Sequence, residues 1–179
     1  MSPLLSYLES LRDKGAPLPS SIEELPAPWP KWFKLLPPPR ETLSEDLDSE
    51  VSDRIQRMMN HASGLPESSE EHRRAKANRL YYAVISCSRV IFNSPLHEGH
   101  GAHQHFALHL LRMAIEEKKL TVEDLTRMER RRRDVYNDRI HADYRIIEPF
   151  DDVDLGRTTI KATKLFNELV ELGKKSSEK

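Results

Sequence analysis

Apolar residues recur at helical spacing along most of the chain from residue 49 onward. Apolar positions three and four residues apart form one face of an amphipathic helix, and that face packs against a core. On this pattern we predict helices over about 49–62, 69–93, 101–118, 121–144 and 155–172. We find no segment with the two-residue alternation of a half-buried strand, so we expect an all-α protein.

Capping and breaking residues mark the ends of these helices. Thr121, followed by Asp124, resembles a capping box that opens the fourth helix, and Pro149 breaks the chain after it. Gly173 is expected to end the last helix. Because the connections are short, we predict an up-and-down antiparallel helical bundle of four to five helices.

The N-terminal segment has a different character, since nine of the chain's 12 prolines lie in residues 1–40. Proline fixes φ and lacks an amide donor, so this stretch forms neither a long helix nor a central strand. A short helix is expected before it, capped by Ser2, carrying Leu4 and Leu8 on one face and ended by Gly15.

The proline-rich stretch is too apolar for a free linker. Its large apolar residues are Trp29, Trp32, Phe33, Leu35 and Leu36. We therefore predict an N-terminal arm that either packs on the helical body or docks a partner through an extended segment. The expected division is a short helix plus arm over 1–45, a helical bundle over 46–175 and a disordered tail over 176–179.

Hydropathy and cysteine content indicate the cellular compartment. Mean hydropathy is −0.66, no apolar run approaches the roughly 20 residues of a membrane span, and no basic-then-apolar segment opens the chain. We expect a cytoplasmic protein without a membrane partner. The single cysteine, Cys87, excludes an internal disulfide framework.

Charge is unevenly distributed although the net charge is −1. Residues 1–70 carry 7 basic and 12 acidic side chains, whereas residues 71–147 carry 15 and 10. A basic middle indicates an anionic partner or self-association of opposite patches; the alternative is a solvated charged helix face.

Five histidines lie close together in the sequence: His97, His100, His103, His105 and His109. On a helix, His105 and His109 share a face and could bind one metal ion. The zincin pattern, however, needs glutamate directly after its first histidine, and Phe106 stands there. We expect capping or packing histidines and no metal site.

The densest positive feature is an arginine run over 130–133. Such a run attracts phosphates in a salt-dependent way, although it is more often a solvated face. By helical periodicity Arg132 and Arg139 fall on the apolar stripe of their helix. An arginine on a core-facing stripe needs a partner, and Asp143, four residues after Arg139, is the predicted one.

Two segments together resemble the HEPN superfamily (higher eukaryotes and prokaryotes nucleotide-binding domains). They are Tyr81-Tyr82-Ala83 and the Arg-x-x-Ala-Asp-Tyr segment over 139–144, with His100 in the loop between them. The similarity covers about residues 49–173 and is greatest to small prokaryotic HEPN proteins often encoded beside a minimal nucleotidyltransferase. It implies a HEPN-like bundle, a homodimer, no cofactor and a nucleotidyltransferase antitoxin as partner.

The resemblance also implies a chemistry that the residues match only in part. Active HEPN ribonucleases work without metal and use R-x4–6-H. Before His141 the corresponding positions hold Asp134, Val135 and Tyr136. On a continuous helix His141 lies about 200° from Arg139, on the opposite side. Ribonuclease activity would have to use Arg139 with Asp143 or His141.

Three functions follow. The first is binding of RNA, a nucleotide or a nucleotidyltransferase partner, as the toxin-side component of a toxin–antitoxin pair. Its expected binding residues are Arg132, Arg133, Tyr81, Tyr82, Tyr144 and His100. The second is a metal-independent endoribonuclease toxin with Arg139, Asp143 and His141 as catalytic residues. The third is a non-catalytic scaffold that docks a protein through the N-terminal arm.

Overall fold

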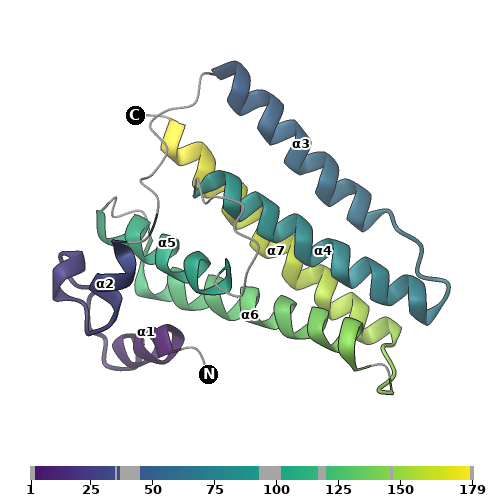
Figure 1. Ribbon diagram of the computed structural model, residues 1–179, viewed down its shortest axis with the longest axis horizontal. Coiled ribbons are helices and arrows are strands. Elements are labelled where there is room, and N and C mark those ends of the chain that lie inside the picture. Colours follow the sequence, from purple (N-terminus) through teal and green to yellow (C-terminus); the bar gives the residue numbers. More distant parts are fainter. Residues whose placement is uncertain are drawn as a thin grey trace. The chain divides into compact units, whose positions relative to one another are not determined.

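A computed structural model of the chain describes residues 3–34, 36, 45–92, 102–116, 120–145 and 147–177. Within these residues the protein forms α-helices and one short 3-10 helix, and no strand (Figure 1). The elements are α1 (Pro3–Asp13), η1 (Ile22–Glu24), α2 (Trp29–Phe33), α3 (Glu45–Ser63), α4 (Glu70–Ile91), α5 (Ala102–Glu116), α6 (Val122–Tyr144) and α7 (Asp152–Ser177). The predicted all-α class is confirmed.

All five helices predicted from residue 49 onward are present, as α3 to α7. The capping box of α6 is formed: the Asp124 N–H donates to Thr121 Oγ1 (3.2 Å), and the Thr121 N–H donates to Asp124 Oδ2 (3.1 Å). After α1, Gly15 has a φ of 61°, the left-handed conformation expected of a glycine that ends a helix.

One predicted helix end is wrong. Helix α7 does not stop before Gly173 but continues to Ser177, into the stretch expected to be a disordered tail. A Cβ atom on Gly173 would lie 3.3 Å from Cγ1 of Ile91 in α4. The missing side chain therefore serves a close approach between α7 and α4 rather than a helix end.

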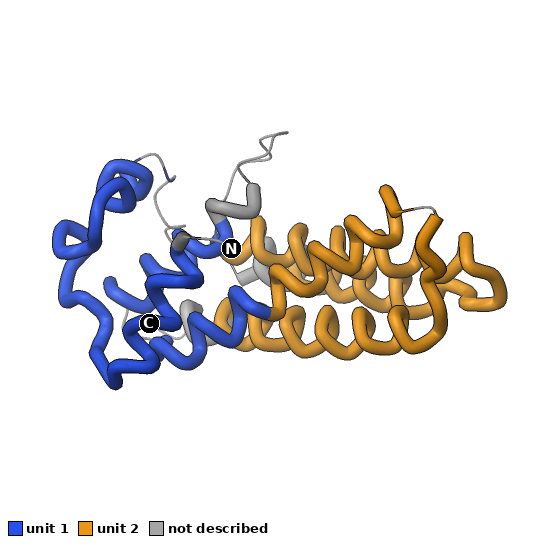
Figure 2. Tube along the Cα trace, turned by 90° about the horizontal axis from the view of Figure 1, so that it is seen from below, with its two compact units in different colours: residues 1–39, 92–130 blue, residues 40–91, 131–179 orange. Residues whose placement is uncertain are grey.

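The chain divides into two compact units (Figure 2). Unit 1 comprises Met1–Pro39 and Phe92–Arg130, and unit 2 comprises Arg40–Ile91 and Arg131–Lys179. Helix α6 runs through the division without a break. This grouping differs from the expected division into 1–45, 46–175 and 176–179, because α5 and the first turns of α6 belong with the N-terminal segment.

Unit 1 is held by contacts within the N-terminal segment and by contacts of that segment with α5 and, through the Glu9–Arg130 ion pair (2.6 Å), with α6. The Tyr7 and Trp29 rings pack with centroids 4.7 Å apart. Arg112 of α5 donates to the backbone carbonyl of Phe33 (3.0 Å), which lies at the end of α2. The N-terminal arm thus packs on residues of its own chain.

Unit 2 is built around α4, which packs against α3 and α7. Its buried residues are Lys76, Ala77, Leu80, Tyr81, Ala83, Val84, Ile85, Cys87 and Ser88. Because neighbouring helices cover α4 on more than one side, its buried residues are not confined to a single stripe. Burial of its one leucine, Leu80, contributes about 1.5–3 kcal/mol. Helix α4 and the C-terminal part of α6 carry the candidate site.

Polar side chains join the second half of α6 to α7. The pairs are Arg131 with Glu168, Asp134 with Lys161 (3.2 Å) and Asp138 with Thr158 (3.0 Å). Residues further along α6 pair with residues earlier in α7, so the two helices run antiparallel.

In the part of the chain that the structure describes, no helix is both long and apolar enough to cross a bilayer.

Candidate functional site

The predicted ion pair between Arg139 and Asp143 is present in α6. Arg139 Nε lies 2.7 Å from Asp143 Oδ2, and the two side chains are 16% and 20% exposed. From α4, the Asn78 Nδ2 group donates to Asp143 Oδ1 (2.7 Å). One oxygen of the Asp143 carboxylate therefore contacts the Asn78 amide, and the other contacts the Arg139 guanidinium.

Three tyrosine rings surround the Arg139 guanidinium. Its Cζ lies 5.8 Å from the ring centroid of Tyr81, 5.9 Å from that of Tyr82 and 5.2 Å from that of Tyr144. These distances are within the range of cation–π attraction. We refer to Tyr81, Tyr82, Arg139, Asp143 and Tyr144 as the tyrosine–arginine site.

The three rings differ in accessibility. Tyr81 is 5% exposed, whereas Tyr82 is 44% and Tyr144 65% exposed. Burial raises the pKa of Tyr81 to about 12, so its phenol stays neutral. Tyr81 thus forms the inner wall of the site, and Tyr82 and Tyr144 expose their rings to solvent.

The charge state of Arg139 is secured by its surroundings. Burial lowers the pKa of this guanidinium, but the charge of Asp143, with smaller contributions from Tyr144 and Tyr82, outweighs burial and leaves the pKa above its ordinary value. A permanent cation beside two exposed rings can hold a phosphate while a base stacks.

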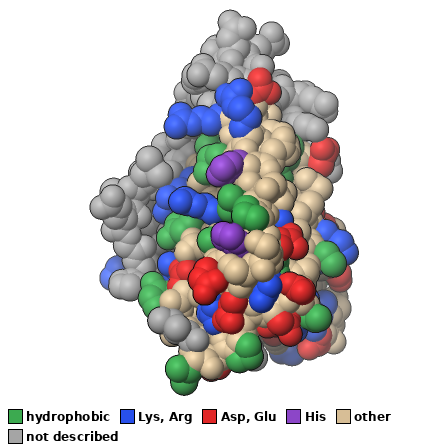
Figure 3. Space-filling model, turned by 90° about the vertical axis from the view of Figure 1, so that its right-hand side faces the viewer, with side chains coloured by type: hydrophobic (Ala, Val, Ile, Leu, Met, Phe, Trp, Pro, Cys, Tyr) green, Lys and Arg blue, Asp and Glu red, His purple; other side chains and the backbone are tan. Residues whose placement is uncertain are grey.

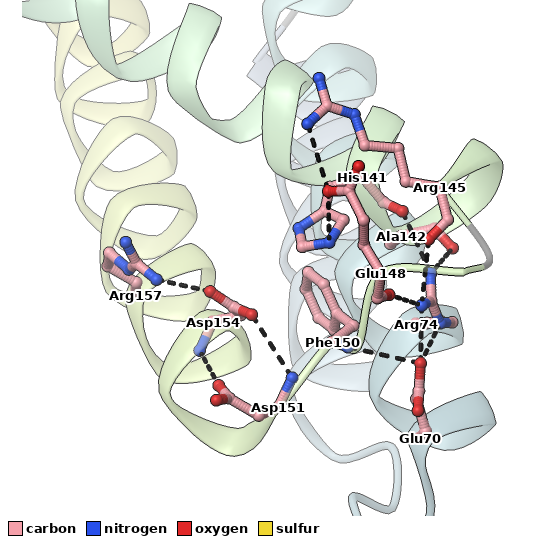
Figure 4. Close-up of polar contacts among 10 residues, drawn as sticks. All are labelled: Glu70, Arg74, His141, Ala142, Arg145, Glu148, Phe150, Asp151, Asp154 and Arg157. Atoms are coloured by element: carbon pink, nitrogen blue, oxygen red, sulfur yellow. Dashed lines mark hydrogen bonds and ion pairs between the residues drawn. The ribbon is translucent and has the colours of Figure 1, made fainter.

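His141 does not join this site. Its ring packs edge-on against Phe150 (5.3 Å), and Nε2 lies 3.7 Å from Glu148 Oε2 (Figure 4). Its neighbours are those of the α6–α7 connection, whereas Arg139 faces the tyrosines. The predicted separation of His141 from Arg139 around the helix is confirmed, and the side chains that contact His141 are different from those that contact Arg139 among the described residues.

Sequence reasoning missed Arg74, the residue that anchors the end of α6. Arg74 donates to the backbone carbonyls of Ala142 (2.8 Å), His141 (3.1 Å) and Glu148 (2.6 Å), as Figure 4 shows. Glu70 in turn accepts from Arg74 (2.6 Å). The one available signal was the Glu–Arg spacing of four residues in α4, which is common on solvated helices.

The arginine run is largely engaged within the chain. Arg130 pairs with Glu9 (2.6 Å) and Arg131 with Glu168. Arg132 is only 5% exposed, so it contributes no accessible cation despite its place among the expected binding residues. Arg133 is partly exposed and forms no ion pair with the described residues. On the face drawn in Figure 3, basic and acidic side chains are interspersed rather than gathered into one basic field.

The histidine region contributes no metal centre to the part of the chain that is described. No group of three or more His, Cys, Asp or Glu side chains there could hold a metal ion. His109 is buried and stacks on the Phe92 ring (5.2 Å), a packing role. His100, expected near the binding site, lies outside the described residues.

No family model matches the chain, and comparisons with curated proteins and with solved structures find no match either. The resemblance to HEPN domains therefore depends on the segments around Tyr81 and Arg139 and stays a prediction.

Proposed function

We propose that this chain is a HEPN-like helical bundle that binds RNA or a nucleotide at the tyrosine–arginine site without cleaving it. The observation that carries the proposal is the Arg139 guanidinium, fixed by Asp143 beside the exposed rings of Tyr82 and Tyr144. Exposed aromatic rings next to a cation suit a stacked base and its phosphate, and every base offers a face for stacking.

The partners of Asp143 favour binding over catalysis. A general base needs a lone pair directed at the proton that it removes. Asp143 Oδ1 accepts from the Asn78 amide, and Oδ2 is held in the ion pair with the Arg139 guanidinium. His141, the other candidate for proton transfer, has Phe150 and Glu148 as its neighbours.

The same geometry predicts that stacking contributes more than phosphate contacts. Asp143 compensates the charge of Arg139, and Arg130 and Arg131 are paired elsewhere. Since each phosphate contact to a single strand adds roughly −0.7 to the slope of log K against log salt, we expect a slope between about −1 and −2.

The resemblance adds a physiological setting to this proposal. A nucleotidyltransferase encoded beside the gene would make the chain the toxin-side component of a toxin–antitoxin pair, with that enzyme as the antitoxin. The RNA or nucleotide site and the enzyme partner are separate parts of the proposal, and the experiment below tests the first.

The test uses the full chain and a labelled single-stranded RNA of mixed sequence in EDTA, with anisotropy for binding and a gel for cleavage. Tyr144→Ala should weaken binding at least fivefold, because base stacking on an aromatic ring is worth about 1–3 kcal/mol. Tyr144→Phe should bind like the wild type, since it keeps the ring. Arg54→Ala, which removes an exposed arginine of α3, is the matched charge control.

Each other outcome identifies a different function. RNA cleavage in EDTA that Arg139→Ala abolishes would establish the metal-independent endoribonuclease and contradict the binding proposal. No binding of RNA or of mononucleotides would also contradict it, and would favour the scaffold function. Binding that Tyr144→Ala leaves unchanged would place the ligand elsewhere on the chain.

A further inference from the structure

One face of helix α4 carries an accessible row of residues that continues from the tyrosine–arginine site. Successive residues of a helix are about 100° apart, so positions 79, 82, 86 and 89 fall within about 80° of one another. We refer to Arg79, Tyr82, Ser86 and Arg89 as the α4 row. Arg79 and Tyr82 are exposed, and Ser86 and Arg89 are half-buried. The buried residues of α4 lie on the other sides of the helix.

Both arginines of the α4 row are unengaged by the described chain. Neither forms an ion pair or a hydrogen bond with a described residue. Arg73 and Arg74 of the same helix provide the contrast, because they pair with Asp152 (3.2 Å) and Glu70 (2.6 Å). The α4 row contains no acidic residue. It is therefore a positively charged face whose two cations are available to an anion.

Tyr82 belongs both to the α4 row and to the tyrosine–arginine site. Its ring centroid lies 5.9 Å from Arg139 Cζ. Arg79 lies about one turn before Tyr82 on α4, and Arg89 lies about two turns after it. With 1.5 Å of helix rise per residue, the two arginines are about 15 Å apart along the axis. At about 3.4 Å per nucleotide of a stacked strand, this length corresponds to about four nucleotides.

We propose that the α4 row is the path of a single-stranded RNA beyond the tyrosine–arginine site, with Arg79 and Arg89 as its phosphate contacts. This inference rests on the proposed function and narrows its ligand from a nucleotide to a strand of about four nucleotides. One base stacks on Tyr82, and the flanking phosphates bind the arginines on either side. Ser86, between Tyr82 and Arg89, can donate its hydroxyl to a phosphate or ribose oxygen.

Charge and continuity favour RNA over other occupants of the α4 row. A membrane or an apolar peptide needs an apolar surface, and the row offers one ring, 44% exposed, between two cations. An acidic protein segment would satisfy the arginines but would leave the rings of Tyr82 and Tyr144 unused. Two phosphate contacts contribute roughly −1.4 to the slope of log K against log salt, which agrees with the slope expected for the proposed function.

Fluorescence anisotropy of labelled oligoadenylates of increasing length tests this path with the full chain in EDTA. Affinity should rise from the mononucleotide to the four-nucleotide RNA and change little beyond it. Arg89→Gln should weaken binding of an eight-nucleotide RNA at least threefold and leave mononucleotide binding unchanged, because Arg89 is about two turns from Tyr82. Arg89→Lys keeps the charge and should bind RNA like the wild type. Tyr144→Ala should weaken binding at every length.

The salt dependence of binding provides a second readout. Arg79→Gln and Arg89→Gln should each reduce the magnitude of the slope of log K against log salt by about 0.7, and the double variant should reduce it by about 1.4. Arg54→Gln, which removes an exposed arginine of α3, should change neither the affinity nor the slope.

The results that overturn this inference are separate from those that overturn the proposed function. An affinity that does not depend on RNA length would exclude the path along α4. So would arginine variants that bind and respond to salt like the wild type while Tyr144→Ala still weakens binding. Polyglutamate that displaces the RNA as well as unlabelled RNA of equal charge would assign the row to an acidic protein segment. Binding of neither RNA nor mononucleotides would contradict the proposed function itself.

Discussion

Asp138 is a carboxylate in a partly buried position between α6 and α7. Burial raises its pKa above the ordinary value of an aspartate, and repulsion from Asp134 acts in the same direction. Lys161 and the hydrogen bond from Thr158 oppose the shift without cancelling it. The folded state therefore binds the proton of Asp138 more tightly than the unfolded state does. Its contribution to stability is present at low pH and is lost as pH rises through the folded pKa.

Asp138→Asn should consequently stabilise the protein at neutral pH relative to the wild type. Asparagine keeps an acceptor for Thr158 and removes the charge that burial disfavours. The advantage should shrink as pH falls and become small near pH 3, about one unit below the ordinary pKa of aspartate, where the wild-type group is mostly protonated in both states. Urea denaturation between pH 3 and 7 measures this difference.

Asp134→Asn is the control for this measurement, because Asp134 also pairs with Lys161 (3.2 Å) but is more exposed. It should show no gain at neutral pH. A wild type that is the more stable protein at pH 7, with a lead that grows with pH, would mean that the pair with Lys161 dominates over burial.

At the residue scale, sequence reasoning found local pairs and missed distant ones. The Arg139–Asp143 pair follows from a four-residue spacing and the cost of an unpaired arginine on an apolar stripe. The burial of Arg132 follows from the same stripe. Asn78 and Arg74 act on residues more than 60 positions away, and no local pattern indicates such contacts.

At the scale of elements, Arg74 connects α4 to the end of α6 and to the connection that follows. The last carbonyl groups of any helix lack partners within it. Here the carbonyls of His141 and Ala142 accept from Arg74, and so does that of Glu148 in the connection. The Arg74 side chain is 14% exposed, and its contacts with the carbonyls of His141 and Ala142 are part-buried, whereas the contact with Glu148 is exposed. Because Asp143 and Tyr144 lie in this last turn, the anchor also positions the tyrosine–arginine site.

Arg74→Met should lower the free energy of unfolding by about 1–3 kcal/mol, since the part-buried carbonyl groups of His141 and Ala142 and the carbonyl group of Glu148 each lose a charged donor. Chemical denaturation measures the loss, and hydrogen exchange should show faster exchange confined at first to residues 142–150. Arg74→Lys should recover only part of the stability, because one ammonium group cannot reach all the carbonyls. Arg79→Met, an exposed arginine of the same helix, is the matched control. Equal effects at positions 74 and 79 would rule out the anchoring role.

The periodicity of apolar residues predicted the helices well and their ends less well. Helices α3 to α7 follow from one repeating pattern, and the α6 capping box follows from Thr121 and Asp124. The predicted end of α7 was wrong because a glycine can either terminate a helix or allow another element to pack closely against it. Only the contact of Gly173 with Ile91 distinguishes them.

At the scale of the whole molecule, the grouping of elements could not be read from the sequence. The connection lengths suggested that α5 belongs with its sequence neighbours, yet it belongs to unit 1 with the N-terminal segment. The hydrogen bond from Arg112 to Phe33 spans 79 residues, and such pairings depend on the shape of the folded surfaces rather than on spacing. The composition of the arm left open whether it packs on the body or docks a partner, and the described part of the arm contacts α5 through Phe33.

The continuity of α6 predicts that the two units unfold together. Residues 122–130 of this helix belong to unit 1 and residues 131–144 to unit 2. Unfolding one unit alone would leave half of α6 without its packing partners, and a helix segment that short is marginal in water.

The aromatic residues of the chain allow unfolding of each unit to be followed separately by spectroscopy. Both tryptophans, Trp29 and Trp32, lie in unit 1, whereas four of the five tyrosines lie in unit 2.

Thermal unfolding followed by tryptophan fluorescence, by tyrosine near-ultraviolet circular dichroism and by far-ultraviolet circular dichroism should therefore give coincident transitions. Val135→Pro, placed within the unit 2 part of α6, should lower all three midpoints together, because proline breaks the shared helix and removes a hydrogen bond (about 3 kcal/mol or more). Leu8→Ala, a core truncation in α1 of unit 1, provides the reverse case and should move the tyrosine signal as far as the tryptophan signal. A tryptophan transition that stays in place in the Val135→Pro protein would instead mean that unit 1 is stable without the second half of α6.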